Sequence, residues 1–176
     1  MPISRITLRL GKTSDARRVA VMSRDLIESG LSWSWTPERV HRALRNPEVL
    51  SVMACDRERV VAFAVTQFGD DQAHLSLLAV DPSHQRQGIG RRLVEWTVES
   101  ALAAGMAAIH LETRAANHAA RGFYRSLGFR ESAYVPGYYG GREMALKMLR
   151  ELRRPGVVDV RWRLPAPPSG SNSGSK

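Results

Sequence analysis

The stretch Gln85-Arg86-Gln87-Gly88-Ile89-Gly90-Arg91-Arg92 decides the fold, because it joins a β-like run to a long helix-like run. Two glycines near a first helical turn each cost up to about 1 kcal/mol relative to alanine, and arginines there oppose the helix dipole. A bound anion reverses both penalties, since uncrowded backbone N–H groups close around phosphate oxygens and arginines add charge-assisted hydrogen bonds. The stretch therefore predicts a phosphate-binding loop, although glycines of this kind also simply shape tight turns.

The segments on either side of this loop follow two different patterns. Before it, short alternating runs bounded by turn residues predict an antiparallel arrangement with two helices near the start; after it, helix and strand patterns alternate. The strands are expected at 6–10, 49–54, 60–67, 73–80, 107–113, 129–135 and 142–149, and the helices at 16–29, 37–45, 88–104 and 117–127. This order predicts a mixed α/β fold with one mostly antiparallel central sheet flanked by helices.

The composition is that of an ordinary globular domain, with 176 residues, 43% of them hydrophobic and 24% charged. We expect a single domain over residues 1–150. Cys55 is the only cysteine, so no intramolecular disulfide can form; together with the lack of a targeting or membrane-spanning pattern, this favours a cytoplasmic protein. The net charge of +9 suits an anionic partner.

The end of the chain has its own pattern. The last 27 residues carry +4 of the net charge of +9, which makes a nucleic-acid partner unlikely for the body of the protein. Residues 151–164 form a C-terminal extension whose alternation over 157–164 predicts an extra strand, added to the chain's own sheet or to a partner subunit, so a homodimer stays open. Residues 165–176, rich in Pro, Ser and Gly, are expected to be a disordered tail.

Several motifs in fixed order resemble one known family. They are Leu78-Ala79-Val80-Asp81-Pro82, Gln85-Arg86-Gln87-Gly88-Ile89-Gly90, Leu111-Glu112, Asn117, Phe123-Tyr124-Arg125-Ser126-Leu127-Gly128-Phe129, Tyr138-Tyr139 and Gly141-Arg142-Glu143. From about Val60 to Leu149 the chain resembles the GCN5-related N-acetyltransferases (GNAT), most like the branch of ribosomal-protein alanine N-acetyltransferases. The resemblance implies a sheet whose fourth and fifth strands splay apart to admit acetyl-CoA.

The resemblance also implies which residues hold the coenzyme. The backbone of one strand would pair with the pantetheine arm, the glycine loop would hold the pyrophosphate, and an asparagine would touch the coenzyme while also capping its helix. These residues are Leu78, Ala79, Val80, Arg86, Gln87, Gly88, Ile89, Gly90, Arg91 and Asn117. A strand N–H of this kind can also stabilise negative charge on the carbonyl oxygen during acyl transfer.

Two residues match the family's catalytic positions. Strand alternation places His110 and Glu112 on one face, and we expect partial burial to raise the pKa of Glu112 until it serves as general base. A strand glutamate can equally be an edge or ion-pair residue. Tyr124 matches the proton donor to the departing thiolate, and its helical spacing also suits a core aromatic.

The acceptor amine is expected between the first two helices and the last hairpin, against Trp33, Trp35, Tyr138 and Tyr139. Tryptophans in loops also act as packing anchors. Three functions stay open: acetylation of a protein or peptide N-terminal α-amine, acetylation of a small amine such as an amino acid or antibiotic, and acyl-CoA binding without catalysis. The five histidines show no metal-ligand spacing, so no metal is predicted.

Overall fold

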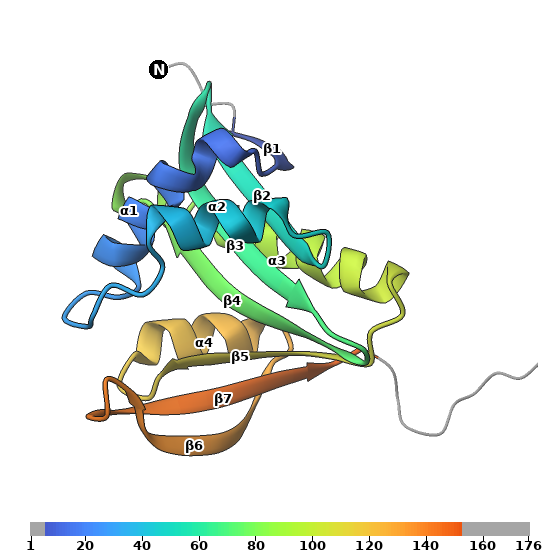
Figure 1. The fold of residues 1–176 in the computed structure, drawn as a ribbon. Helices are drawn as coiled ribbons and strands as arrows, with labels where there is room; N and C mark the ends of the chain where they lie inside the picture. Colours follow the sequence, from blue (N-terminus) through green and yellow to red (C-terminus); the bar gives the residue numbers. More distant parts are fainter. Residues whose placement is uncertain (1–5, 153–176) are drawn as a thin grey trace, which may run out of the picture.

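A seven-stranded sheet in the order β1-β2-β3-β4-β5-β7-β6 organises the computed structural model, which describes residues 6–152 (Figure 1). The strands are β1 (Ile6–Leu10), β2 (Val49–Asp56), β3 (Arg59–Phe68), β4 (Gln72–Val80), β5 (Ala108–Arg114), β6 (Arg130–Tyr139) and β7 (Glu143–Glu151). The helices are α1 (Ala16–Leu26), α2 (Pro37–Arg45), α3 (Ile89–Ala103) and α4 (His118–Ser126), with short 3-10 turns at Thr13–Asp15 and Pro82–His84. The predicted mixed sheet flanked by helices is confirmed.

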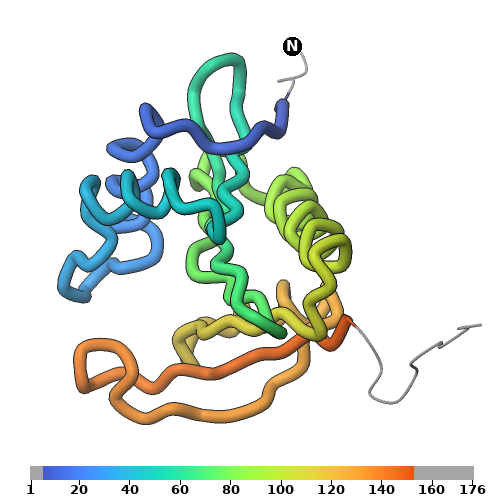
Figure 2. Tube along the Cα trace, turned by 45° about the vertical axis from the view of Figure 1, so that its right-hand side comes forward, coloured from blue at the N-terminus to red at the C-terminus, as the bar shows by residue number. Residues whose placement is uncertain are grey.

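The sheet consists of two antiparallel parts joined by a short parallel seam. β1 to β4 form one part and β5, β7 and β6 the other. β4 and β5 pair only through Gln72↔Ala108, Ala73↔Ile109 and His74↔His110. Beyond His74 the two strands separate, so the facing edges of Leu75–Val80 and Leu111–Arg114 carry no neighbouring strand (Figure 2).

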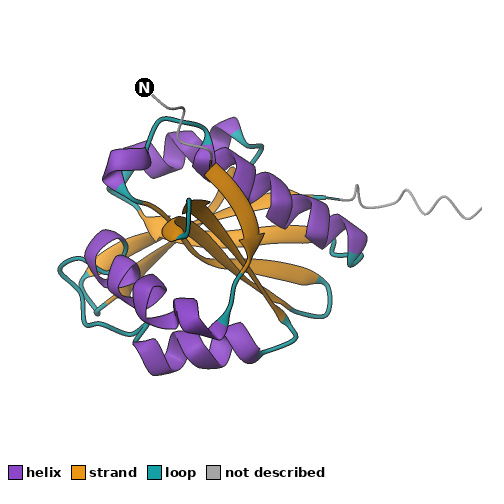
Figure 3. Ribbon diagram, turned by 90° about the horizontal axis from the view of Figure 1, so that it is seen from above, coloured by secondary structure: helices purple, strands orange, loops and turns teal. Residues whose placement is uncertain are grey.

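Helices cover both faces of the sheet, which Figure 3 shows from above. α1 and α2 pack on one face over a core that includes Phe63, while α3 and α4 pack on the other over a core that includes Leu93. β4 contributes to both cores, and the register shift between Val65 and Thr66 of β3 changes which of its residues face each side. Leu75 therefore faces the α3 side and Leu77 the α1 side, and Ser76 between them has no register partner.

Helix boundaries follow local hydrogen bonds. Pro37 occupies the first position of α2, and the Thr36 hydroxyl accepts from the Arg39 amide at 3.4 Å. α1 ends at Leu26, three residues before the predicted end, because Glu28 leaves the helix. Its buried carboxylate accepts from the Ser34 amide at 2.7 Å and from the Ser23 hydroxyl at 3.0 Å, which folds the following loop back onto α1.

The predicted strand at 157–164 and the predicted tail at 165–176 lie outside the described residues. Within the described part, none of the helices has both the length and the apolar composition needed to cross a membrane.

Candidate active site

A cavity of about 500 Å³ opens where β4 and β5 separate. Its walls come from both strand edges, from the end of α1, from α4 and from the β6–β7 hairpin. Residues predicted from the sequence that line it are Leu78, Glu112, Asn117, Tyr124 and Tyr139. The loop between α1 and α2 and the turn of the β6–β7 hairpin lie at the same end of the molecule (Figures 1 and 2).

Leu78, Ala79 and Val80 form one of these edges. They pair with Ala64, Phe63 and Ala62 of β3 on one side and have no strand on the other. Backbone N–H and C=O groups of a strand alternate between its two sides, so half of those on this segment face the open edge. This is the arrangement that an extended amide-containing chain needs to add itself to the sheet.

The loop at 85–91 leads from that edge into α3. Arg86 (φ 62°) and Gly88 (φ 76°) both adopt left-handed backbone conformations, and Gly88 is the residue before the first turn of α3. A Cβ on Gly88 would meet no atom within 4 Å, so the space beside the helix start is open. Gly90 differs, because its Cβ would lie 3.2 Å from the Phe123 ring. One glycine thus shapes the loop and the other lets α3 approach α4.

This loop fits the phosphates of a coenzyme. The first N–H groups of a helix have no intrahelical partner and, with the helix dipole, attract an anion. Arg86, Gln87 and Arg91 are exposed around the start of α3, where they can add hydrogen bonds to phosphate oxygens. Ile89 is buried and anchors the start of the helix instead.

Glu112 lies on β5 with its side chain 9% exposed. Its Oε2 is 2.6 Å from Nε2 of His74, and its Oε1 is 3.9 Å from Nζ of Lys147. Desolvation raises the pKa of Glu112, but the hydrogen bond from His74 and the charges of His74, His110 and Lys147 together lower it below its ordinary value. The prediction that burial would raise this pKa is therefore wrong. Glu112 is an ionised carboxylate at neutral pH.

His74 and His110 form a stacked pair beside this carboxylate, with ring centroids 4.6 Å apart and planes 6° from parallel. The ligand atoms of His74, His110 and Glu112 lie within 4.8 Å of one another. Imidazole lone pairs lie in the ring planes, and two parallel planes do not meet at one metal ion. The pair therefore needs a ring rotation before it could ligate a metal, and the existing partner of Glu112 is a hydrogen-bonding imidazole.

Tyr124 is buried in α4, where burial raises its pKa above the ordinary value. Its ring packs edge-on against Phe123 and Phe129, at centroid distances of 5.1 and 5.6 Å, and it also lines the cavity. Tyr124 is therefore both a core aromatic residue and a residue that lines the cavity. The raised pKa keeps the phenol protonated at neutral pH, so it carries a proton to donate, and it also makes Tyr124 a weaker acid than an exposed tyrosine.

Asn117 also combines two roles, as a helix cap and as a residue of the cavity wall. Its side-chain oxygen accepts from the Ala120 amide at 3.1 Å, which caps α4, and the residue lines the cavity. The cap fixes the start of the helix that carries Tyr124.

Among the four aromatic residues predicted for the acceptor side, Tyr139 is the one that lines this cavity. Trp33 is exposed beneath Arg24, and Trp35 packs against the α1–α2 core with Arg39 at 4.1 Å from its ring centroid. Trp35 lines a separate hollow of about 320 Å³ beside α2. Tyr138 is exposed and contacts Tyr139 edge-on at 4.9 Å. Trp35 thus fits the packing-anchor alternative, whereas Trp33 is exposed and packs against neither core.

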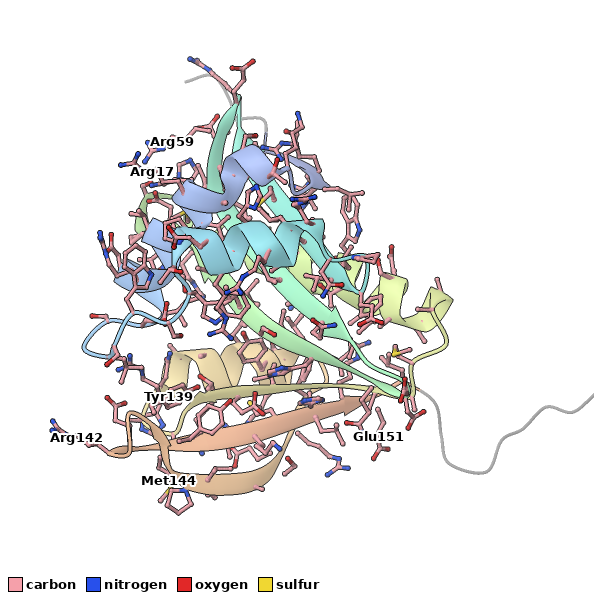
Figure 4. All side chains as sticks on the ribbon, viewed as in Figure 1. Arg17, Arg59, Tyr139, Arg142, Met144 and Glu151 are labelled. Carbon is pink, nitrogen blue, oxygen red and sulfur yellow. The ribbon has the colours of Figure 1, made fainter. Side chains whose placement is uncertain are left out.

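The sequence analysis missed Arg114. Its guanidinium donates to the backbone carbonyls of Ile27 (3.1 Å) and Ser29 (2.6 Å) and pairs with Glu143 (3.2 Å), so it ties the α1–α2 loop to β7. The signal was present, because strand alternation places residue 114 on the same face as 110 and 112. Figure 4 shows Tyr139 at this end of the hairpin and Arg142 pointing outward from its turn.

An open strand edge, a helix start suited to phosphates, an ionised carboxylate and a buried phenol around one cavity define a class of protein. They suit an acyltransferase that takes its acyl group from an extended, phosphorylated carrier.

The comparisons with known proteins agree with this class. The model of the Acetyltransferase (GNAT) family matches residues 20–129. The ribosomal protein bS18-alanine N-acetyltransferase of Escherichia coli K12 is 38% identical over 120 residues, which cover 66% of this chain and 80% of that protein. The crystal structure of the E. coli ribosomal-protein-S18-alanine N-acetyltransferase aligns with a TM-score of 0.75 and 30% identity over 88% of this chain and 98% of that one. The N-alpha-acetyltransferase RimI of Mycobacterium tuberculosis is 29% identical over 138 residues, or 76% of this chain and 84% of that protein.

The chain belongs to the GNAT acetyltransferase family. It is an N-acetyltransferase that uses acetyl-CoA as donor and an amine as acceptor.

Proposed function

We propose that the acceptor is the N-terminal α-amine of a protein or peptide, with Glu112 as the general base and Tyr124 as the general acid. The observation that carries this proposal is the pair of free strand edges on either side of the cavity. The β4 edge can take the coenzyme arm. The β5 edge, which pairs with β7 on its other side, leaves room for the backbone of an extended peptide.

Within this site each group has a chemical task. Acetyl-CoA, when bound, supplies the activated acetyl thioester. Glu112 accepts one proton from the acceptor's ammonium group, which leaves a neutral amine able to form the new N–C bond as the C–S bond breaks. The Tyr124 hydroxyl gives its proton to the departing sulfur, and the second proton, which the nitrogen loses as it becomes an amide, restores the phenol.

The residues at the two sides of the cavity opening are consistent with a peptide acceptor. Tyr139, Arg114 and Glu143 lie at the hairpin side, and Leu26, Ile27 and Ser29 at the α1 side. The relative in E. coli is named an alanine N-acetyltransferase of ribosomal protein bS18, and the relative in M. tuberculosis is named an N-alpha-acetyltransferase. The binding residues proposed for the coenzyme are those of the β4 edge and the 85–91 loop, together with Asn117.

A cytoplasmic location suits an enzyme that draws on acetyl-CoA and whose Cys55 is a buried free thiol. The homodimer that the C-terminal pattern allows would be detected from the mass of the enzyme in solution.

Acceptor competition tests this proposal. We compare acetylation of a peptide with a free N-terminal alanine, the same peptide with a blocked N-terminus and an internal lysine, and alaninamide. We expect kcat/KM for the free peptide to exceed the other two by about tenfold or more, the effect of one lost charge-assisted hydrogen bond. Equal turnover of alaninamide would instead assign a small-molecule acceptor.

Glu112→Gln is the control for chemistry, with Glu95→Gln on the exposed face of α3 as the matched carboxylate. We expect Glu112→Gln to lower kcat about 100-fold or more. Acetyl-CoA binding without turnover in the wild type, unchanged by Glu112→Gln, would favour a non-catalytic binding module.

A further inference from the structure

His74 lies at the apex of the opening between β4 and β5. The pair His74↔His110 is the last register pair before the strands separate. From this position the His74 ring reaches across the seam, and its Nε2 lies 2.6 Å from Oε2 of Glu112. His74 is thus the residue of β4 that contacts the carboxylate of β5 at the point where the cavity begins.

The His74 ring is held from three directions. His110 stacks on its face at 4.6 Å, Glu112 binds Nε2, and the Ser76 hydroxyl lies 3.4 Å from Nδ1. Ser76 is the residue left without a register partner by the shift between β3 and β4. Both Ser76 and Glu112 line the cavity, whereas His74 is behind them with its side chain 33% exposed.

Charged and titratable groups from three strands face this pair. His110 of β5 and Lys147 of β7 lower the pKa of Glu112, whereas burial raises it. On β6, burial raises the pKa values of Tyr138 and Tyr139, and the negative charge of Glu112 raises both further. His74 is the group that makes a direct hydrogen bond to the carboxylate. Without it, desolvation of Glu112 would be opposed only by the more distant His110 and Lys147.

We propose that His74 is a positioning residue for the Glu112 base: through Nε2 it keeps the carboxylate ionised and oriented, and so sets the pH range in which Glu112 accepts the acceptor's proton. This inference rests on the proposed role of Glu112 as base. The proton balance is simple, because the ammonium group of the acceptor becomes an amine and the carboxylate becomes a carboxylic acid, which returns the proton to water. His74 supplies the hydrogen bond that favours the ionised carboxylate before the transfer and again once the proton has passed to water.

The test is the pH profile of kcat/KM for the wild type, His74→Leu and His74→Gln, measured with one acceptor so that its own titration is common to all. Glu112 must be ionised to act, so activity falls on the acid side as the carboxyl group becomes protonated. Loss of the His74 hydrogen bond raises the pKa of Glu112. We expect the acid limb of His74→Leu to move up by about one to two pH units, which is a 10- to 100-fold loss below the limb. Above the limb its activity should return to within about threefold of the wild type.

His74→Gln keeps a side-chain N–H donor and should show a smaller shift. His41→Gln, an exposed histidine on α2, is the control and should leave the profile unchanged. A loss that is equal at every pH would assign His74 a purely structural role, and an unchanged profile would refute the proposal. If Glu112→Gln keeps full activity, the assignment of the base fails instead, whatever the His74 variants do.

Discussion

Gly88 and Gly30 share one backbone conformation but lie at different places in the fold. Their φ angles are 76° and 78°, and a Cβ at either position would meet no atom within 4 Å. Substitution of either glycine by alanine should therefore lower the free energy of unfolding by a similar amount, about 1–2 kcal/mol. Gly88 lies at the start of α3, beside the proposed phosphate site, whereas Gly30 lies in the α1–α2 loop.

We predict that Gly88→Ala weakens acetyl-CoA binding about tenfold, because the loop can no longer direct its N–H groups at the phosphates without strain. Calorimetric titration of acetyl-CoA into both variants measures this, and Gly30→Ala should bind like the wild type. Equal affinities for Gly88→Ala and Gly30→Ala would show that Gly88 serves only the turn.

For single residues, the sequence predicted the direction of side chains but not their contact partners. Alternation along β5 placed His110 and Glu112 on one face, as observed. It could not identify His74 as the partner of Glu112, because that contact depends on the register across a parallel crossover that spans α3. The pKa prediction for Glu112 failed for the same reason, since it included burial but not the imidazole.

At the scale of elements, Arg114 joins two segments that border the cavity. Its guanidinium binds two carbonyls of the α1–α2 loop and the Glu143 carboxylate of β7. We predict that Arg114→Met raises KM for the peptide acceptor about tenfold and lowers the free energy of unfolding by about 1–2 kcal/mol, because two backbone carbonyls lose a charged donor.

Steady-state kinetics and thermal unfolding of Arg114→Met check this prediction. Arg130→Met is the matched control, because Arg130 also pairs with a glutamate of β7, Glu151 at 2.7 Å, but at the far end of that strand from the cavity. A larger change in KM for Arg130→Met than for Arg114→Met would contradict the assignment of the acceptor side.

The order of elements was predictable, whereas two of their details were not. Capping signals at Thr36 and Asn117 and the glycine before α3 mark helix starts that the structure shows. The early end of α1 depends on the buried Glu28, whose partners lie in the following loop. The register shift in β4 is invisible in the sequence, where apolar and polar residues alternate from Ala73 to Leu77 across it, yet it gives Ser76 its place beside His74.

For the whole molecule, stability in acid depends on carboxylates with lowered pKa values. Asp15 is buried; desolvation raises its pKa, but hydrogen bonds from Arg9, at 2.7 and 2.8 Å, and from the Lys12 amide lower it overall. A carboxylate whose pKa is lowered by folding stabilises the protein above its unfolded pKa, about 3.9, and this contribution is lost as pH falls through the folded value.

We predict that Asp15→Asn lowers the free energy of unfolding by about 2 kcal/mol at pH 7, because Arg9 loses its charged partner. The difference from the wild type should shrink below about pH 4, where Asp15 of the unfolded chain becomes protonated, and should disappear once the pH falls below the lowered pKa of folded Asp15. Urea unfolding at several pH values measures both. A difference that stays constant down to pH 2 would show that the ion pair does not govern acid sensitivity.

The short parallel pairing of β4 with β5, three residues in each strand, implies a conflict between stability and catalytic activity. A protein engineer who sought a sturdier molecule would be tempted to close this gap, since six residues of β4 and four of β5 lack a neighbour on their facing edges. Each added residue pair between β4 and β5 would stabilise the isolated chain. It would also fill the space in which coenzyme and acceptor are proposed to meet. In the proposed binding mode, coenzyme and acceptor take the place of the missing strand pairing during turnover, so selection for catalysis would keep the sheet incomplete.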